Sequence, residues 1–126
     1  MYAGLDLFRL SSAMTAHAGQ RQAVTAANIA TADTPGCRAR TIDGFADLLQ
    51  RGGSPALRVT RPGHLSPPGA SAQANEIDAG GQAAPNGNTV SLEREMVNAT
   101  QAVQEQARAL AIYRHGLSVL RLVGGR

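Results

Sequence analysis

The side chains best suited to chemistry in this sequence, three histidines and one cysteine, are widely spaced. His17, His64 and His115 stand in three different segments, with no His-x-x-x-His pair and no neighbouring cluster of carboxylates. A transition-metal site needs several such ligands brought together at regular spacing. The sequence therefore predicts no metal site, and His17 and His115 are interpreted as polar positions on helices.

Cys37 is the remaining candidate nucleophile, because it follows the sharp turn Pro35-Gly36 and would be displayed there. Nothing near it in the sequence can be assigned as its base, and four aromatic residues in the whole chain leave little to line a substrate pocket. No glycine-rich run of the Gly-x-Gly-x-x-Gly or Walker type is present. We therefore expect neither enzymatic activity nor a cofactor, and the role of Cys37 stays open.

The composition predicts one small domain whose thin apolar core is supplemented by contacts with a partner chain. The 126 residues suffice for a single core, and the 43% that are hydrophobic are mostly Ala, Leu and Val. Small side chains bury little apolar area and stabilise a core less than aromatic clusters do. The net charge is +3, but the twelve arginines are scattered among nine acids, so no basic run typical of nucleic-acid binding appears.

The N-terminal segment, residues 1–36, is predicted to be one long helix with a terminating turn. Residues 5–33 contain no proline and are rich in Ala, Leu, Met, Gln and Arg. Pro35-Gly36 fits the central pair of a type II turn, with Gly36 supplying the positive φ. One helix face predicts close approach of a second helix and consists of Ala13, Ala16, Gln20, Ala23, Ala27 and Ala30.

The C-terminal segment, residues 89–126, is predicted to be a second long helix with a heptad pattern. Ser91 is expected to cap its start, and Gly124-Gly125 to end it. Residues spaced alternately by four and three form an apolar seam typical of a coiled coil, which we expect to bury against the N-terminal helix and neighbouring chains. The assembly seam consists of Leu92, Met96, Ala99, Val103, Leu110, Tyr113, Leu117 and Leu120, with Gln106 as its polar position.

The middle segment, residues 37–88, is predicted to be a flexible linker. Within residues 51–90, seven Gly and five Pro interrupt regular structure. Two short elements are expected, a helical turn over 45–50 and an extended piece over 57–60. Between residues 66 and 85 almost no large apolar side chain is present, so this stretch is expected to be mobile in the isolated chain.

The pair Phe45 and Leu49 has two interpretations. The spacing of four places both side chains on one face of the predicted helical turn. The pair either packs as a small staple against the long helices or serves as a docking peptide for another protein.

Two sequence blocks stand at the helix boundaries: the first is Asn28-Ile29-Ala30-Thr31-Ala32-Asp33-Thr34-Pro35-Gly36, and the second runs from residue 86 to residue 96. The first block resembles the N-terminal signature of the bacterial flagellar rod and hook proteins. The second is similar to the Gly-Asn-Thr-Val-Asp-Leu-x-x-Glu-Met block of the proximal-rod member of that family. Thr31 stands where Asn is usual, Cys37 where an aromatic is usual, and Ser91 where Asp is usual.

The resemblance implies a mostly α-helical protein, in which segments 1–36 and 89–126 form one axial domain of paired helices joined by the linker. It implies a structural component of the proximal rod, which crosses the periplasm and transmits torque. The implied partners are copies of itself, other rod proteins, rod-base and membrane-ring components, and the flagellar type III export gate. Phe45 and Leu49 then resemble the hydrophobic gate-recognition motif of early rod and hook substrates.

No cleaved signal peptide is expected, since Asp6 and Arg9 interrupt the stretch where a signal peptide would be apolar. Export through the flagellar type III apparatus is what the resemblance implies. No run approaches eighteen consecutive apolar residues, so no membrane insertion is expected. The alternative is a small helical adaptor or a weak basic nucleic-acid binder.

Overall fold

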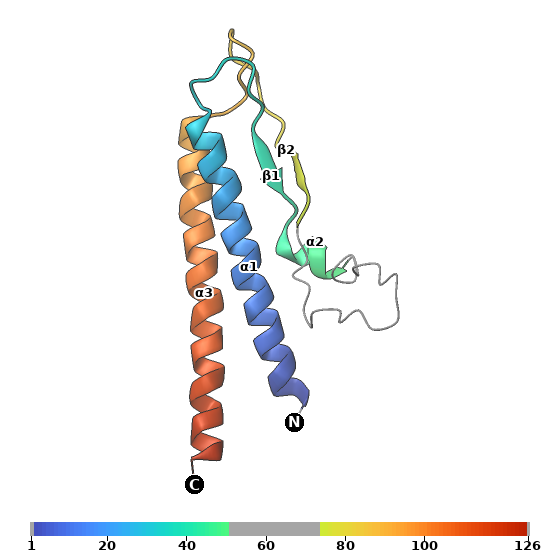
Figure 1. Cartoon of the computed structure of the whole chain (residues 1–126), viewed down its shortest axis with the longest axis vertical. Helices are drawn as coiled ribbons and strands as arrows, with labels where there is room; N and C mark the ends of the chain where they lie inside the picture. Colours follow the sequence, from blue (N-terminus) through green and yellow to red (C-terminus); the bar gives the residue numbers. More distant parts are fainter. Residues whose placement is uncertain (1, 51–73, 126) are drawn as a thin grey trace, which may run out of the picture.

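The computed structural model describes residues 2–50 and 74–125. Its elements are α1 (Tyr2–Ala30), β1 (Arg40–Ile42), α2 (Phe45–Gln50), β2 (Glu76–Asp78) and α3 (Leu92–Gly124). The helices α1 and α3 run side by side in opposite directions, so both chain ends lie at one end of the pair (Figure 1). The two strands lie along the other side of α1, away from α3. The expected extended piece over 57–60 and His64 lie outside the described residues.

Small side chains line the interface between the two long helices. The buried residues follow a seven-residue spacing on each helix: Ser11, Ala18 and Thr25 on α1, and Ala102, Ala109 and Gly116 on α3. Close approach of the helices is therefore confirmed, but the Ala face predicted for it is wrong, since Ala16, Ala23, Ala27 and Ala30 are exposed.

The predicted seam on α3 lies beside the contact with α1 rather than on it. Met96, Val103, Leu110 and Leu117 each follow a buried residue by one position, which turns them about 100° round the helix. Val103 is 55% exposed and Met96 60% exposed. The expectation that the seam buries against α1 is thus wrong within one chain for Met96 and Val103, because Ala and Gly permit a closer approach than Val or Met. Tyr113 meets Phe8 of α1, and Leu117 is half-buried. Contacts of the seam with other chains stay a prediction.

The ends of the long helices largely match the sequence analysis. Gly36 has φ of 73°, which confirms the turn that ends the first segment. Gly124 is the last residue of α3. Ser91 occupies the N-cap position with extended backbone, but its side chain makes no capping hydrogen bond, so the predicted capping chemistry is wrong.

The strand pair was missed by the sequence analysis. The strands β1 and β2 pair in antiparallel fashion, with Thr41 opposite Ile77. Exposed ion pairs flank them, Arg38 with Asp78 at 2.8 Å and Arg40 with Glu76 at 2.9 Å. Part of the predicted linker is therefore ordered. The sequence did not reveal these strands because three residues with charged side chains lack the apolar alternation that marks longer strands.

The short helix α2 confirms the helical turn over 45–50. Among the described residues, no helix is both long and apolar enough to cross a membrane.

Candidate functional site

Asn28, at the start of the first signature block, joins three elements. Its Oδ1 accepts a hydrogen bond from the backbone N–H of Arg40 at 3.0 Å, and its Nδ2 donates to the carbonyl of Arg40 at 2.7 Å. The same Nδ2 donates to Oε2 of Glu95 on α3 at 3.1 Å. Asn28 is 4% exposed. One side chain therefore fastens the last turn of α1 to β1 and to α3.

Asn88, in the second block, binds the turn just beyond α1. Its Nδ2 lies 3.0 Å from the carbonyl oxygen of Thr31, 2.6 Å from that of Ala32 and 2.9 Å from that of Thr34. Its Oδ1 accepts from the backbone N–H of Val90 at 2.7 Å. These carbonyls lie in the turn just beyond α1, which ends at Ala30. Asn88 therefore ties that turn to the segment before α3.

Backbone hydrogen bonds join the two blocks directly. Gly36 N–H donates to the carbonyl of Asn86, and Thr89 N–H donates to the carbonyl of Cys37. The hydroxyl of Thr89 accepts from Ala39 N–H at 2.9 Å. Gly87 has φ of 79°, and a Cβ there would lie 3.6 Å from Cα of Gly36. The Asn-Gly-Asn-Thr sequence is thus shaped to pack against the turn that follows α1.

Glu95 is the buried charged residue of this region, 3% exposed on the inner face of α3. Its Oε1 accepts from Nδ2 of Asn98 at 3.3 Å, and its Oε2 accepts from Asn28. Among the described side chains, no buried nitrogen or oxygen lacks a hydrogen-bond partner. We call Asn28, Asn88 and Glu95, with the backbone of residues 31–40 and 84–90 that they hold, the polar clasp.

The remaining signature residues lie on the surface of the clasp. Ile29, Ala30, Asp33, Thr34 and Pro35 are all exposed. The sequence analysis singled out the first block, but it missed that Asn88 and Glu95 are its partners. A sequence signal was present, since both lie in the second block, and a polar residue seven positions before Ala102 interrupts the line of small residues.

The seam on α3 exposes several large apolar side chains outside the clasp, among them Met96 and Val103. Leu92, Tyr113 and Leu120 are also exposed, whereas Ala99 and Leu117 are half-buried. The structure therefore brings the seam residues into one stripe, which one chain leaves largely uncovered. Such a stripe is typical of protein–protein contacts.

Phe45 and Leu49 differ in exposure. Phe45 is half-buried, with its ring centroid 5.6 Å from that of His17, and Leu49 is 51% exposed. His17 is buried, and its Nε2 lies 2.8 Å from the carbonyl oxygen of Asp43. The interpretation of His17 as a plain polar helix position is corrected, because it anchors the start of α2. His115 is exposed on α3.

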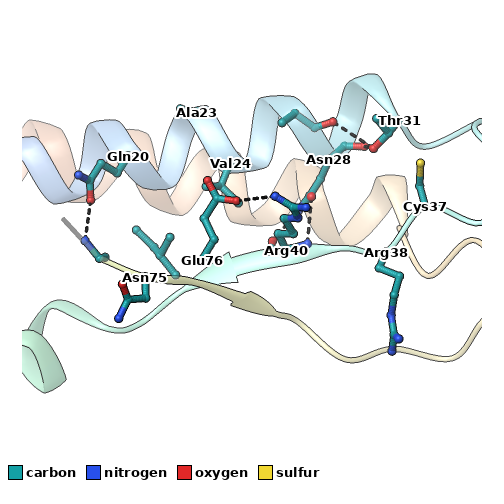
Figure 2. A pocket seen from close by; sticks show the side chains of 13 residues that line it. Gln20, Ala23, Val24, Asn28, Thr31, Cys37, Arg38, Arg40, Asn75 and Glu76 are labelled. Atoms are coloured by element: carbon teal, nitrogen blue, oxygen red, sulfur yellow. Dashed lines mark hydrogen bonds and ion pairs between the residues drawn. The ribbon is translucent and has the colours of Figure 1, made fainter.

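A groove of about 930 Å³ lies between α1 and the strand pair (Figure 2). Arg40 and Glu76, from the two adjacent strands, meet in an ion pair on its strand side, and Cys37 stands at one end. Its walls also include Ala23, Ala27 and Gln20 of α1 and the aliphatic side chains of Val24 and Ile42. Within residues 2–50 and 74–125, no three His, Cys, Asp or Glu side chains gather to hold a metal ion.

These features define a structural protein built on two terminal helices, since the signature residues join elements of the fold. Curated relatives agree. The flagellar basal body rod protein FlgB of Salmonella typhimurium is 37% identical over 110 residues, which cover 80% of this chain and 75% of the relative. The FlgB proteins of Escherichia coli K12 and Yersinia ruckeri are 44% and 37% identical over 88 and 91 residues.

The chain belongs to the FlgB family of flagellar basal body rod proteins. The matched region covers 60% of this chain and 62% of the Escherichia coli protein, and 63% of this chain and 64% of the Yersinia ruckeri protein. No protein-family profile matches the chain.

Proposed function

We propose that this protein is a structural subunit of the flagellar proximal rod, which assembles through its terminal helices and transmits torque. The observation that carries the proposal is the exposed apolar seam on α3, in a chain whose relatives are named rod proteins. One chain covers the line of small residues on α3 but leaves Met96, Val103 and Leu120 more than half exposed. Burial of these side chains between subunits would stabilise a rod by about 25 cal/mol per Å² of apolar area.

The partners in this proposal are copies of the chain, other rod proteins and the rod-base and membrane-ring components. A rigid helix pair about 50 Å long, from the 33 residues of α3, is suited to carry load along its axis. The protein acts in this role without an enzymatic reaction. It is made in the cytoplasm and reaches the periplasm-spanning rod through the flagellar type III apparatus without a cleaved signal.

Phe45 and Leu49 dock at the export gate in this proposal. Leu49 is accessible in the folded chain, and Phe45 becomes accessible when α2 leaves His17. An unfolded chain in transit presents both side chains. The alternative, an adaptor or nucleic-acid binder, is not favoured by any contact among the described residues or by the relatives named above.

The experiment that tests the function compares basal bodies from the source organism with those from a strain lacking the gene. Detergent-extracted basal bodies are analysed by mass spectrometry for this chain. The proposal expects the chain to co-purify and the deletion strain to build no rod beyond the membrane ring. Complete rods in the deletion strain, with the chain found only in the cytosol, would overturn it.

A further inference from the structure

The interface between α1 and α3 does little to select one alignment of the two helices. Small residues recur every seven positions on both contact lines, so a shift by one heptad again places small residues against small residues. Coiled coils with uniform contact layers need a polar residue to select one register. The 61 residues between the helices, 31–91, are long enough to permit such a shift.

Contacts that fit only one alignment gather in the polar clasp. Asn28 reaches Glu95 across the interface, and both are buried. Asn88 sits four residues before α3 and binds three carbonyls just beyond α1, which ties the start of one helix to the end of the other. A shift of seven residues moves α3 by about 10 Å along α1. That movement would separate all of these atoms and leave the Glu95 carboxylate buried without its partners.

Contacts elsewhere along the helix pair favour one alignment of α1 and α3 less strongly. The ion pair between Arg21 and Glu105, at 2.7 Å, joins side chains that are 28% and 40% exposed, and such pairs contribute little. At the open end, Phe8 meets the edge of Tyr113, with ring centroids 5.2 Å apart. Phe8 also packs on Gly116, where a Cβ would come within 3.2 Å of Cζ. A shift that places Ala109 there needs a local adjustment of the ring, whereas a shift at the clasp leaves a buried carboxylate without its partners.

We infer that the polar clasp holds α1 and α3 in register, and that Asn88 and Glu95 are register-determining residues. The clasp thereby also decides which side chains of α3 stay outside as the exposed seam. Buried polar contacts act here as selectors of one alignment, a role known for single buried Asn residues in helix pairs. The inference concerns the isolated chain and does not depend on the proposed flagellar role.

Distances between two spin labels test the register. In a Cys37→Ser background, labels are placed through Ser12→Cys on α1 and Thr100→Cys on α3, both exposed and well separated along the axis. The parent is expected to give one distance. Asn88→Ala combined with Glu95→Leu is expected to add a second distance, displaced by up to about 10 Å. A single unchanged distance in this variant would overturn the inference.

Two matched controls accompany the clasp variant. Glu95→Gln keeps an acceptor for Asn28, and Arg21→Gln with Glu105→Gln removes the other polar contact between the helices. Both are expected to keep the single distance. A second distance from the Arg21 and Glu105 control alone would assign the register to that ion pair and contradict the inference.

Hydrogen exchange of the unmodified chain provides a measurement that does not rely on a variant folding. A clasp that holds the register must stay closed whenever the helices are paired. The N–H groups of Ala39, Arg40 and Thr89 are therefore expected to exchange as slowly as those of residues 102–109. Exchange at the clasp that is tenfold faster than in the middle of α3 would overturn the inference.

Discussion

The ring of Phe8 lies against Gly116, across the open end of the helix pair. A Cβ at Gly116 would come within 3.2 Å of Cζ and 3.3 Å of Cε1 of Phe8. These distances are shorter than ordinary van der Waals contacts. The absence of a side chain at Gly116 therefore lets α1 and α3 approach at this end.

The first prediction follows from that contact. Gly116→Val is expected to lower the free energy of unfolding by about 1–3 kcal/mol, because the added methyl groups overlap Phe8 and Leu7. Gly19 is the matched control, since an added Cβ there has no neighbour within 4 Å. Gly19→Ala is expected to raise stability by about 0.5–1 kcal/mol, because Ala favours helix over Gly. Urea unfolding followed by circular dichroism measures both, and equal stability of the two variants would contradict the contact.

The second prediction concerns Asn28. Asn28→Ala is expected to cost about 2–3 kcal/mol, since it leaves the N–H and carbonyl of Arg40 and the Glu95 carboxylate short of partners. Asn28→Asp is expected to cost more than Asn28→Ala. An aspartate side chain has no amide donor and adds a second negative charge beside Glu95. Denaturant unfolding at neutral pH gives the order, and an Asp variant as stable as the parent would contradict the role assigned to Asn28.

The third prediction separates the assembly seam from folding. Val103→Asp is expected to change the unfolding free energy of the isolated chain by no more than about 0.5 kcal/mol, because Val103 is 55% exposed. The same variant is expected to abolish motility, since a charge would enter the proposed interface between subunits. Gln104→Asp, on the neighbouring exposed position, is the control and is expected to stay motile. Full motility of the Val103→Asp strain would contradict the assignment of the seam as a contact between subunits.

The fourth prediction distinguishes the two interpretations of Phe45 and Leu49. Phe45→Ala alters both the contact with His17 and the proposed docking motif, whereas Leu49→Ala alters a side chain that is half in water. If the pair docks at the export gate, Leu49→Ala accumulates inside the cell with an unchanged melting temperature. Immunoblots of cell and periplasmic fractions measure this. Normal export of both variants would leave the pair as a packing contact.

Local chemistry along the chain determined most of the secondary structure. Pro35-Gly36 ends the first helical segment because proline disfavours helix before it and glycine accepts positive φ. The second helix follows from a stretch up to Gly124 that has no proline and is rich in Ala, Leu, Gln, Glu and Arg. The two blocks that carry the family resemblance were likewise visible, because they are contiguous in sequence.

Tertiary structure decided which faces of the helices meet and what the signature residues do. The heptad pattern placed Val103 and Leu110 on one apolar face of the helix. The spacing of apolar residues alone does not distinguish a face that contacts α1 from one that contacts another chain. In the folded chain α3 contacts α1 through Ala102 and Ala109 instead, since small side chains allow the closest approach of two backbones. Asn28 and Glu95 are 67 residues apart, and nothing local to either predicts their hydrogen bond. Only the folded chain, by bringing both helix ends together out of water, makes that contact form.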